Sequence, residues 1–178
     1  MSSHAKHSVC VRVGRGLAFP ARGDKRSIEE RSRMTTAKQL IAHLQLAQHP
    51  EGGWYRETWR ADAQDGQRAS ATLIHFLLEA GQHSHWHTVD AAEIWLWHAG
   101  NPLELGTAPP GGEAAQNIIL GPDLLEGHAA QHVIAPGHWQ AARPLSGPYD
   151  YTLVSCAVSP GFEFSGFTLA PAGWKPGA

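Results

Sequence analysis

The sequence predicts an all-β domain, a sandwich or closed barrel, with one helix before it. Three observations support this fold class. A length of 178 residues favours one domain that is large enough to bury a core. From residue 54 onward, short runs of apolar, β-branched and aromatic residues follow one another between clusters of Gly and Pro. Between these runs no segment has the apolar period of a helix, so a doubly wound parallel sheet is not expected.

The predicted helix precedes the first strand. Threonines at 35 and 36 are good N-cap residues, and Leu40, Ile41 and Leu44 fall on one helical face. The segment at residues 49–53 reads His-Pro-Glu-Gly-Gly, which is typical of a turn. The helix is therefore expected to end before this turn.

Turn residues such as Gly81, Gly100 and the Pro-Pro-Gly-Gly run at 109–112 separate the strands. We assign a single domain to residues 34–171 and expect a flexible tail at residues 172–178. The sequence has no internal repeat and no second domain. The predicted strands lie at residues 54–60, 71–78, 84–89, 93–99, 103–107, 117–120, 132–135, 139–143, 151–158 and 163–169.

The charges are distributed unevenly along the chain. The formal net charge is −2, from 14 Lys and Arg residues against 16 Asp and Glu residues. Residues 1–33 hold eight of the basic residues and three of the acidic ones, without an apolar period or a secretory-type hydrophobic stretch. We therefore expect a disordered leader at residues 1–33, either a native extension or a segment upstream of a true start at Met34. Glu29 and Glu30 argue against a transit peptide.

Several classes of function are disfavoured. The chain has no sustained basic stripe, so nucleic acid is not an expected partner. Every hydrophobic run is interrupted before the roughly 18 apolar residues of a membrane span, so no membrane partner is expected. Cys10 and Cys156 match no zinc or redox spacing, and a reducing, cytoplasmic location fits best. No P-loop, Gly-x-Ser-x-Gly or Gly-x-Gly-x-x-Gly motif is present, so no nucleotide cofactor is expected.

The strongest chemical signal lies between residues 81 and 100. On a strand, residues i and i+2 point to the same face, so His85 and His87 can converge on one metal ion. Glu93 opens the next predicted strand and supplies a third ligand. Two imidazoles and one carboxylate would hold a divalent ion, Fe, Mn, Ni or Zn, and leave positions open for a substrate. The alternative is that these histidines are hydrogen-bonded residues of the core or the surface.

Other side chains are candidates for the wall or mouth of a pocket that binds a small molecule. If Glu93 points into the barrel, Trp95 and Trp97 do so too, whereas His98 faces outward unless a bulge intervenes. Plain core packing is the alternative for both tryptophans. The remaining candidates are His75, either a core histidine or a pocket residue, Tyr55 and Glu57, at the pocket mouth or in edge-strand pairs, and Trp139, in the core or the pocket.

The segment from Gly81 to Gly100 resembles the first conserved motif of the cupin superfamily, which reads Gly, His-x-His, a short gap, Glu, six residues and Gly. Three residues separate Gly81 from His85, and five separate His87 from Glu93. The resemblance is more specific to cupin family 5, a family of small single-domain cupins, over residues 34–171. It implies a double-stranded β-helix, or jelly roll, with a ligand site inside the barrel, and a homodimer. The segments that carry this resemblance are residues 49–58, 72–78, 93–95, 136–142 and 159–162.

The sequence also departs from the cupin pattern. The second cupin motif normally supplies another His after its Pro-x-Gly turn, but after this turn the chain offers only His138 and Gln140 as a fourth ligand or pocket residue. In family 5, the positions of His87 and Glu93 are the more usual motif positions. We therefore rank these two above His85 as catalytic and metal-binding candidates.

Three functions follow as hypotheses. The first is an enzyme that moves a proton on a small polar metabolite, carbohydrate-like or a keto acid, in a metal-assisted isomerase, epimerase or lyase reaction. In it, His87 or Glu93 moves the proton. The second is an iron-dependent dioxygenase. The third is a binding protein without turnover, which the missing second-motif His favours. A cupin fold hosts many unrelated reactions, so the fold does not decide among them.

Overall fold

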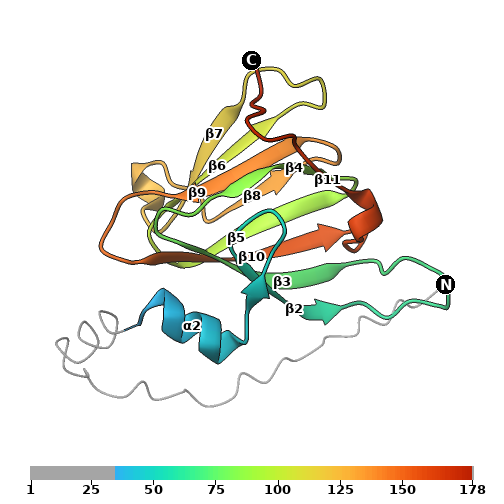
Figure 1. Ribbon diagram of the computed structural model, residues 1–178, viewed down its shortest axis with the longest axis horizontal. Helices are drawn as coiled ribbons and strands as arrows, with labels where there is room; N and C mark the ends of the chain where they lie inside the picture. Colours follow the sequence, from blue (N-terminus) through green and yellow to red (C-terminus); the bar gives the residue numbers. More distant parts are fainter. Residues whose placement is uncertain (1–34, 178) are drawn as a thin grey trace, which may run out of the picture. The chain divides into compact units, whose positions relative to one another are not determined.

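The computed structural model describes residues 35–177. The disordered leader expected at residues 1–33 and the candidate start at Met34 lie outside the described residues. Within the described part, two antiparallel sheets face each other, and the chain crosses repeatedly from one sheet to the other (Figure 1). The predicted class, an all-β jelly roll with one N-terminal helix, is confirmed.

The larger sheet has six strands in the order β1-β2-β3-β10-β5-β8, and the smaller has five in the order β11-β4-β9-β6-β7. Neighbouring strands pair antiparallel throughout both sheets. The six-stranded sheet consists of β1 (Ala47–Gln48), β2 (Trp54–Arg60), β3 (Thr72–Glu79), β5 (Ala92–Gly100), β8 (Gln131–Ile134) and β10 (Tyr151–Ser159). The five-stranded sheet consists of β4 (Ser84–Val89), β6 (Leu103–Ala108), β7 (Gln116–Leu120), β9 (Trp139–Pro144) and β11 (Phe167–Leu169). The helices are α2 (Ala37–Leu44) and the 3-10 turns η1 (Leu124–Glu126) and η2 (Phe164–Gly166).

Nine of the ten predicted strands begin and end within one residue of the observed bounds. The expectation of one strand over residues 163–169 is wrong, because the turn η2 interrupts it. The backbone N–H of Asp90 donates to the carbonyl of Gly166 at 3.0 Å, and a Cβ at position 166 would lie 2.3 Å from Asp90 Cγ. Only β11 therefore pairs with β4, and the turn folds beside the open end of the barrel.

The apolar core lies between the two sheets. Its side chains alternate along each strand with outward-facing ones, as the pleat of a strand requires. Removal of this apolar area from water holds the sheets together. The most fully buried members are Phe76 and Leu78 on β3, Trp95 on β5, Val154 on β10, Leu103 and Leu105 on β6, and Leu120 on β7.

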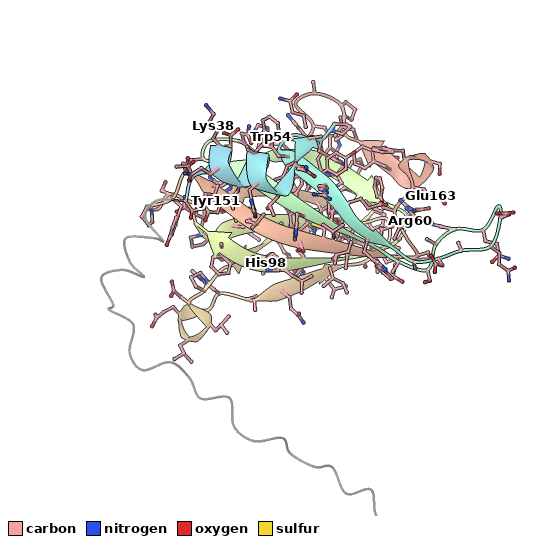
Figure 2. All side chains as sticks on the ribbon, turned by 90° about the horizontal axis from the view of Figure 1, so that it is seen from below. Lys38, Trp54, Arg60, His98, Tyr151 and Glu163 are labelled. Atoms are coloured by element: carbon pink, nitrogen blue, oxygen red, sulfur yellow. The ribbon has the colours of Figure 1, made fainter. Side chains whose placement is uncertain are left out.

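The helix α2 covers part of the outer face of the six-stranded sheet, where Leu40, Ile41 and Leu44 pack against buried residues that include Leu77 and Tyr151. Figure 2 shows Tyr151 beside the helix. The predicted apolar face of the helix is therefore the face that packs. Among residues 35–177, no helix is long and apolar enough to cross a membrane.

The helix begins with a capping box. The side chain of Thr36 accepts from the backbone N–H of Gln39 at 3.3 Å, and the Gln39 side chain accepts from the backbone N–H of Thr36 at 2.8 Å. Replacing Thr36 with Ala is expected to lower the free energy of unfolding by about 1 kcal/mol, because the backbone N–H of Gln39 loses its side-chain acceptor. Denaturant unfolding measures this difference. Thr35→Ala, which lies outside the capping box, serves as the control and should leave stability within about 0.5 kcal/mol.

The C-terminal segment packs on the outer face of the five-stranded sheet. A flexible tail is predicted at residues 172–178. In the structure, the ring centroid of Trp174 lies 4.2 Å from that of Trp139 and 6.2 Å from that of Trp86. The N–H of Gly177 also donates to the carbonyl of Gly112 at 2.7 Å. These contacts attach the segment to β4, β9 and the loop after β6.

Candidate functional site

The turn between β1 and β2 brings Glu51 into the barrel. Gly52 has a φ of 107°, and a Cβ at this position would lie 2.5 Å from the carbonyl oxygen of His83. Only glycine permits both the conformation and the close approach. The carbonyl of Glu51 accepts from the N–H of His85 at 2.8 Å, so the turn is attached to the start of β4. The Glu51 side chain is consequently directed inward, and the residue is only 6% exposed.

Replacing Gly52 with Ala is expected to destabilise the protein by about 2 kcal/mol or more, because the new Cβ meets backbone as well as adopting an unfavourable φ. Gly81→Ala is the matched control: its φ is also positive, at 86°, but no heavy atom lies within 4 Å of the added Cβ. This control measures only the cost of placing alanine at a positive φ, about 1 kcal/mol. Equal melting temperatures for the two variants would show that the close approach to His83 is unimportant.

A carboxyl group and an imidazole meet at the base of the barrel. Glu51 Oε2 lies 3.2 Å from His87 Nε2 and 3.5 Å from His49 Nδ1, while Ser84 Oγ donates to Glu51 Oε1 at 3.1 Å. The other nitrogen of His87, Nδ1, lies 2.8 Å from the carbonyl oxygen of His85 and must donate to it. In the neutral imidazole, Nε2 is therefore the unprotonated nitrogen, and it faces Glu51.

Burial changes the proton affinity of these groups. Loss of hydration raises the pKa of Glu51 to about 8, partly offset by the hydrogen bond from Ser84. Burial also lowers the pKa of His87, against the attraction of Glu93, and lowers the pKa of His49 to about 4. The neutral forms of Glu51 and His87 are thus favoured together. The carboxyl proton of Glu51 is then shared with His87 Nε2.

A second buried carboxyl, Glu93, faces the same cavity from β5. Burial raises its pKa, while the nearby His87 opposes that rise. The amide nitrogen of Gln140 donates to Glu93 Oε2, and the amide oxygen of Gln140 accepts from Trp95 Nε1 at 2.9 Å. Because the indole N–H can only donate, it fixes which end of the amide faces Glu93. The Cys156 thiol is hydrogen-bonded to Glu93, and burial raises the pKa of that thiol, so the sulfur stays protonated.

These groups open into a cavity of about 460 Å³ at one end of the barrel. Its mouth lies between β2 and the segment that follows β10, and Figure 2 shows Arg60 and Glu163 at this same end of the molecule. Both Nε and Nη2 of Arg60 donate to the carboxylate of Glu57, at 3.0 and 2.7 Å. The walls are His49, Tyr55, Thr72, Ile74, Phe76, Val89, Val158, Phe162 and Phe164, around Glu51, His87, Glu93 and Cys156.

His85 does not share the cavity with His87. The pairing of β4 with β9 shifts register between Ser84 and His87, which places those two residues, three positions apart, on the inner face. The expectation that His85 and His87 converge therefore fails, because a bulge breaks the alternation of side chains. His85 is exposed, and its ring lies 4.4 Å from that of His83 on the outer surface.

Several other predicted site residues lie away from the cavity. His75 and His98 both contact Ser155 Oγ, at 3.3 and 2.7 Å, on the outer side of the six-stranded sheet. Figure 2 shows His98 far from Arg60. The indole N–H of Trp97 donates to the carbonyl of Asn101 at 3.1 Å, and its ring packs against the core. Trp139 packs on Trp174, and His138 lies in the turn before β9, outside the cavity lining. Of the predicted pocket residues, Tyr55 and Glu57 line the cavity, and Trp95 reaches it through Gln140.

The predicted metal ligands do not form one ligand set. His85 points outward, and both ends of the Gln140 amide are occupied, so only His87 and Glu93 remain in the cavity. Among residues 35–177, no group of three or more His, Cys, Asp or Glu side chains is arranged to hold a metal ion. The predicted four-residue set therefore does not fit a metal ion in this structure.

Glu51 and His49 belong to the site but were not among the sequence-derived candidates. Their segment looks like a turn, and turn residues are expected at the surface. The sequence does contain one signal. Glu51 is followed by two consecutive glycines, and glycine allows the backbone to approach another segment closely. The segment that Gly52 approaches, at His83, is distant in the sequence, so a local pattern cannot predict the contact.

Comparison with known proteins identifies the family of this chain. The sequence profile of Cupin_5, described as cupin superfamily (DUF985), matches residues 38–170, which include both sheets and every residue of the cavity. The chain belongs to this family. A search of curated proteins found no match to this Cupin_5 protein.

Two solved structures share both fold and appreciable sequence with this Cupin_5 protein. A protein from Shewanella oneidensis is 36% identical, with a TM-score of 0.72 over 77% of this chain and 85% of that chain. A hypothetical protein from Leishmania major is 32% identical, with a TM-score of 0.68 over 76% of this chain and 88% of that chain. Oxalate decarboxylase from Bacillus subtilis is 12% identical, with a TM-score of 0.51 over 68% of this chain and 29% of that chain, a likeness of fold alone.

Proposed function

We propose that this cupin binds a small carbonyl or hydroxycarbonyl compound inside the barrel and moves a proton on it, as an isomerase, epimerase or lyase. The observation that carries this proposal is the buried pair formed by Glu51 Oε2 and His87 Nε2, 3.2 Å apart in a cavity open at one end. A carboxyl with a pKa of about 8 can give or take a proton near neutral pH, which is what general acid–base catalysis requires.

In the proposed reaction, Glu51 donates its proton to the carbonyl oxygen of the ligand. His87 Nε2, released from that proton, accepts a proton from the adjacent carbon. The electron pair of the broken C–H bond becomes the C=C bond of an enol, and the carbonyl π pair forms the new O–H bond. In a hydroxycarbonyl ligand the enol is an enediol: His87 returns its proton to the former carbonyl carbon, while the hydroxyl on the other carbon gives its proton to the Glu51 carboxylate and becomes the new carbonyl, which completes isomerisation. In epimerisation the enol O–H proton returns to Glu51, and a proton reaches the opposite face of the original carbon, a step that we assign to Glu93. In the lyase outcome the enol O–H proton also returns to Glu51, the carbonyl re-forms, the C=C pair moves to the next carbon–carbon bond, and the leaving group departs with the proton from His87.

Two further contacts support these roles. The His85 carbonyl holds Nδ1–H of His87 and so stabilises the imidazolium that forms when Nε2 takes a proton. Glu93 faces the same cavity and is held by Gln140, which makes it the second group we assign to proton movement. Cys156 takes no part in the chemistry, because its thiol stays protonated.

Hydrogen exchange in heavy water tests the proposal. The protein is incubated with α-hydroxy ketones, sugars and 2-keto acids, and deuterium incorporation next to the carbonyl is followed by mass spectrometry. We expect catalysed incorporation into at least one class, lost in His87→Ala. Incorporation at the wild-type rate in His87→Ala would contradict the assigned site.

A binding protein without turnover is the second candidate. The observation that favours it is Gln140, whose amide ties Glu93 to Trp95 where the second cupin motif normally offers a His. This candidate predicts a ligand-dependent rise in melting temperature with no deuterium incorporation from any ligand that binds. The same experiment therefore separates it from the enzyme.

Metal-dependent chemistry, including an iron-dependent dioxygenase, remains a prediction from the sequence. Its support is the chemistry of His87 and Glu93, whose imidazole and carboxylate are ligand types that Fe, Mn, Ni and Zn accept. Oxalate decarboxylase from Bacillus subtilis has Mn(II) centres. Elemental analysis of protein purified without chelator tests this candidate. Absence of stoichiometric metal, together with no gain of binding or activity on adding these four metals, would reject it.

A cytoplasmic homodimer is the state we propose for the protein. The family resemblance supports the dimer, and Trp59 on β2 and Val133 on β8 are separate exposed apolar side chains on the outer face of the six-stranded sheet. Light scattering on the purified chain measures the mass, and a monomer at micromolar concentration would contradict the proposal. Cys156 is a free, buried thiol, which agrees with a reducing compartment.

A further inference from the structure

The lining of the cavity carries information about the class of ligand. Acidic side chains outnumber basic ones among the residues that line it. Glu51 and Glu93 lie at the base, Glu57 and Glu163 at the mouth, and Arg60 is the single Lys or Arg. A carboxylate or phosphate at the base would meet two carboxyl groups and no cation. Burial of an unpaired anion is strongly unfavourable.

The one cation at the mouth is already engaged. Arg60 makes two hydrogen bonds to Glu57, and Nη2 also donates to the carbonyl of Phe162 at 3.2 Å. A bidentate ion pair of this kind satisfies the guanidinium, so an incoming anion would have to displace a carboxylate that is already in place. The mouth therefore does not select anions either.

The walls offer few hydrogen bonds to a polyhydroxylated ligand. Ile74, Phe76, Val89 and Val158 are apolar, and the rings of Phe162 and Phe164 lie 5.1 Å apart at the mouth. Within residues 35–177, every buried side-chain nitrogen and oxygen already has a hydrogen-bond partner. Hydroxyl groups along these walls would lose water without replacing it, which disfavours a sugar.

The polar group that can take up a ligand lies at the base of the cavity. Glu51 and His87 can exchange their mutual hydrogen bond for one to a ligand oxygen without leaving a buried group unpaired. From the placement of the charges, the apolar walls and this one exchangeable bond, we infer that the cavity selects a largely apolar molecule without a negative charge, which carries one carbonyl or hydroxyl centre and enters with that centre first. This inference rests on the proposed site but narrows its ligand, away from sugars and keto acids.

A matched set of probes tests the inference by calorimetry. The uncharged probe is 2-hydroxyacetophenone; phenylglyoxylate is the anionic keto acid with the same ring, and fructose is the polyhydroxylated probe. We expect the uncharged probe to bind at least tenfold more tightly than each of the others. Equal or tighter binding of either of the other two, or no binding of all three, would overturn the inference.

The variant Glu57→Gln sharpens the test. It removes the carboxylate that occupies Arg60, so the affinity for phenylglyoxylate, relative to that for 2-hydroxyacetophenone, should rise at least fivefold. Glu126→Gln, an exposed glutamate in η1 outside the cavity, should change neither. An unchanged anion affinity in Glu57→Gln would show that the ion pair does not exclude anions.

Failure of this inference is distinguishable from failure of the proposed chemistry. Binding of 2-hydroxyacetophenone without deuterium incorporation would leave the ligand class standing and remove the catalysis. Deuterium incorporation into fructose or a keto acid alone would keep the catalysis and remove the ligand class.

Discussion

Replacement of Glu51 by Gln is expected to lower the rate of proton exchange by about 10²- to 10⁴-fold, the usual contribution of a general acid or base. Glutamine keeps the shape of the side chain and can still accept from Ser84, but it cannot donate an acidic proton to the ligand. Ligand affinity should change by less than tenfold. The loss would therefore appear in kcat, measured by deuterium incorporation in single-turnover and steady-state experiments.

The pH profile gives this prediction a second readout. The proposed reaction uses the protonated form of Glu51, whose pKa is about 8, so the wild-type rate should fall as the pH rises above that value. Glu113→Gln, an exposed glutamate outside the cavity, is the control and should keep the wild-type rate and profile. A Glu51→Gln rate within tenfold of wild type would reject Glu51 as the acid.

The same substitution is expected to change how stability depends on pH. In the unfolded chain the carboxyl of Glu51 ionises near its ordinary pKa of 4.5, whereas in the folded protein it stays protonated up to about 8. The unfolded state thus binds fewer protons in this range, and the contribution of Glu51 to stability declines as the pH rises from 4.5 to 8. Above 8 the contribution is constant.

The ionisation of His49 changes stability with pH in the opposite direction, and at lower pH than the ionisation of Glu51. The pKa of His49 falls from 6.5 to about 4 on folding, so stability is lost as the pH drops from 6.5 to 4. Between pH 6.5 and 8, the Glu51 contribution is therefore not opposed by His49. We expect the free energy of unfolding of wild type, minus that of Glu51→Gln, to decrease by about 2 kcal/mol across this interval, since one pKa unit corresponds to about 1.4 kcal/mol.

Denaturant titrations of both proteins at pH 6.5, 7.2 and 8 would measure this difference. The subtraction removes the contributions of groups that do not interact with Glu51. A constant difference across the three pH values would mean that Glu51 ionises normally in the folded protein, and the proton-sharing pair with His87 would then be rejected.

The sequence predicted most of the fold because the relevant signals are local. Strands such as β4 and β10 are bounded by turn residues within a few positions, and Leu40, Ile41 and Leu44 mark the buried face of α2 without reference to the rest of the chain. His87 and Glu93 were predicted for a related reason: a short segment brings them onto two consecutive strands, and both line the cavity.

The errors concern residues whose position depends on distant contacts. The bulge between Ser84 and His87 arises in the pairing of β4 with β9, so alternation along β4 alone misplaces His85. His98 faces outward, as alternation after Trp97 predicts, and the register shift between Trp97 and the following alanine does not turn it into the cavity. Glu51 was missed because its turn is defined by an approach to His83, which no local pattern encodes.

The bulge in β4 also affects how metal content should be measured. By turning His85 to the surface beside His83, with ring centroids 4.4 Å apart, it creates an exposed imidazole pair of the type that binds to nickel resin. Purification on such a column would load this surface pair regardless of what the cavity holds. Nickel or zinc that is lost in a His83→Ala, His85→Ala double variant is therefore a contaminant from the column. Only metal that remains bound in that variant belongs to the barrel.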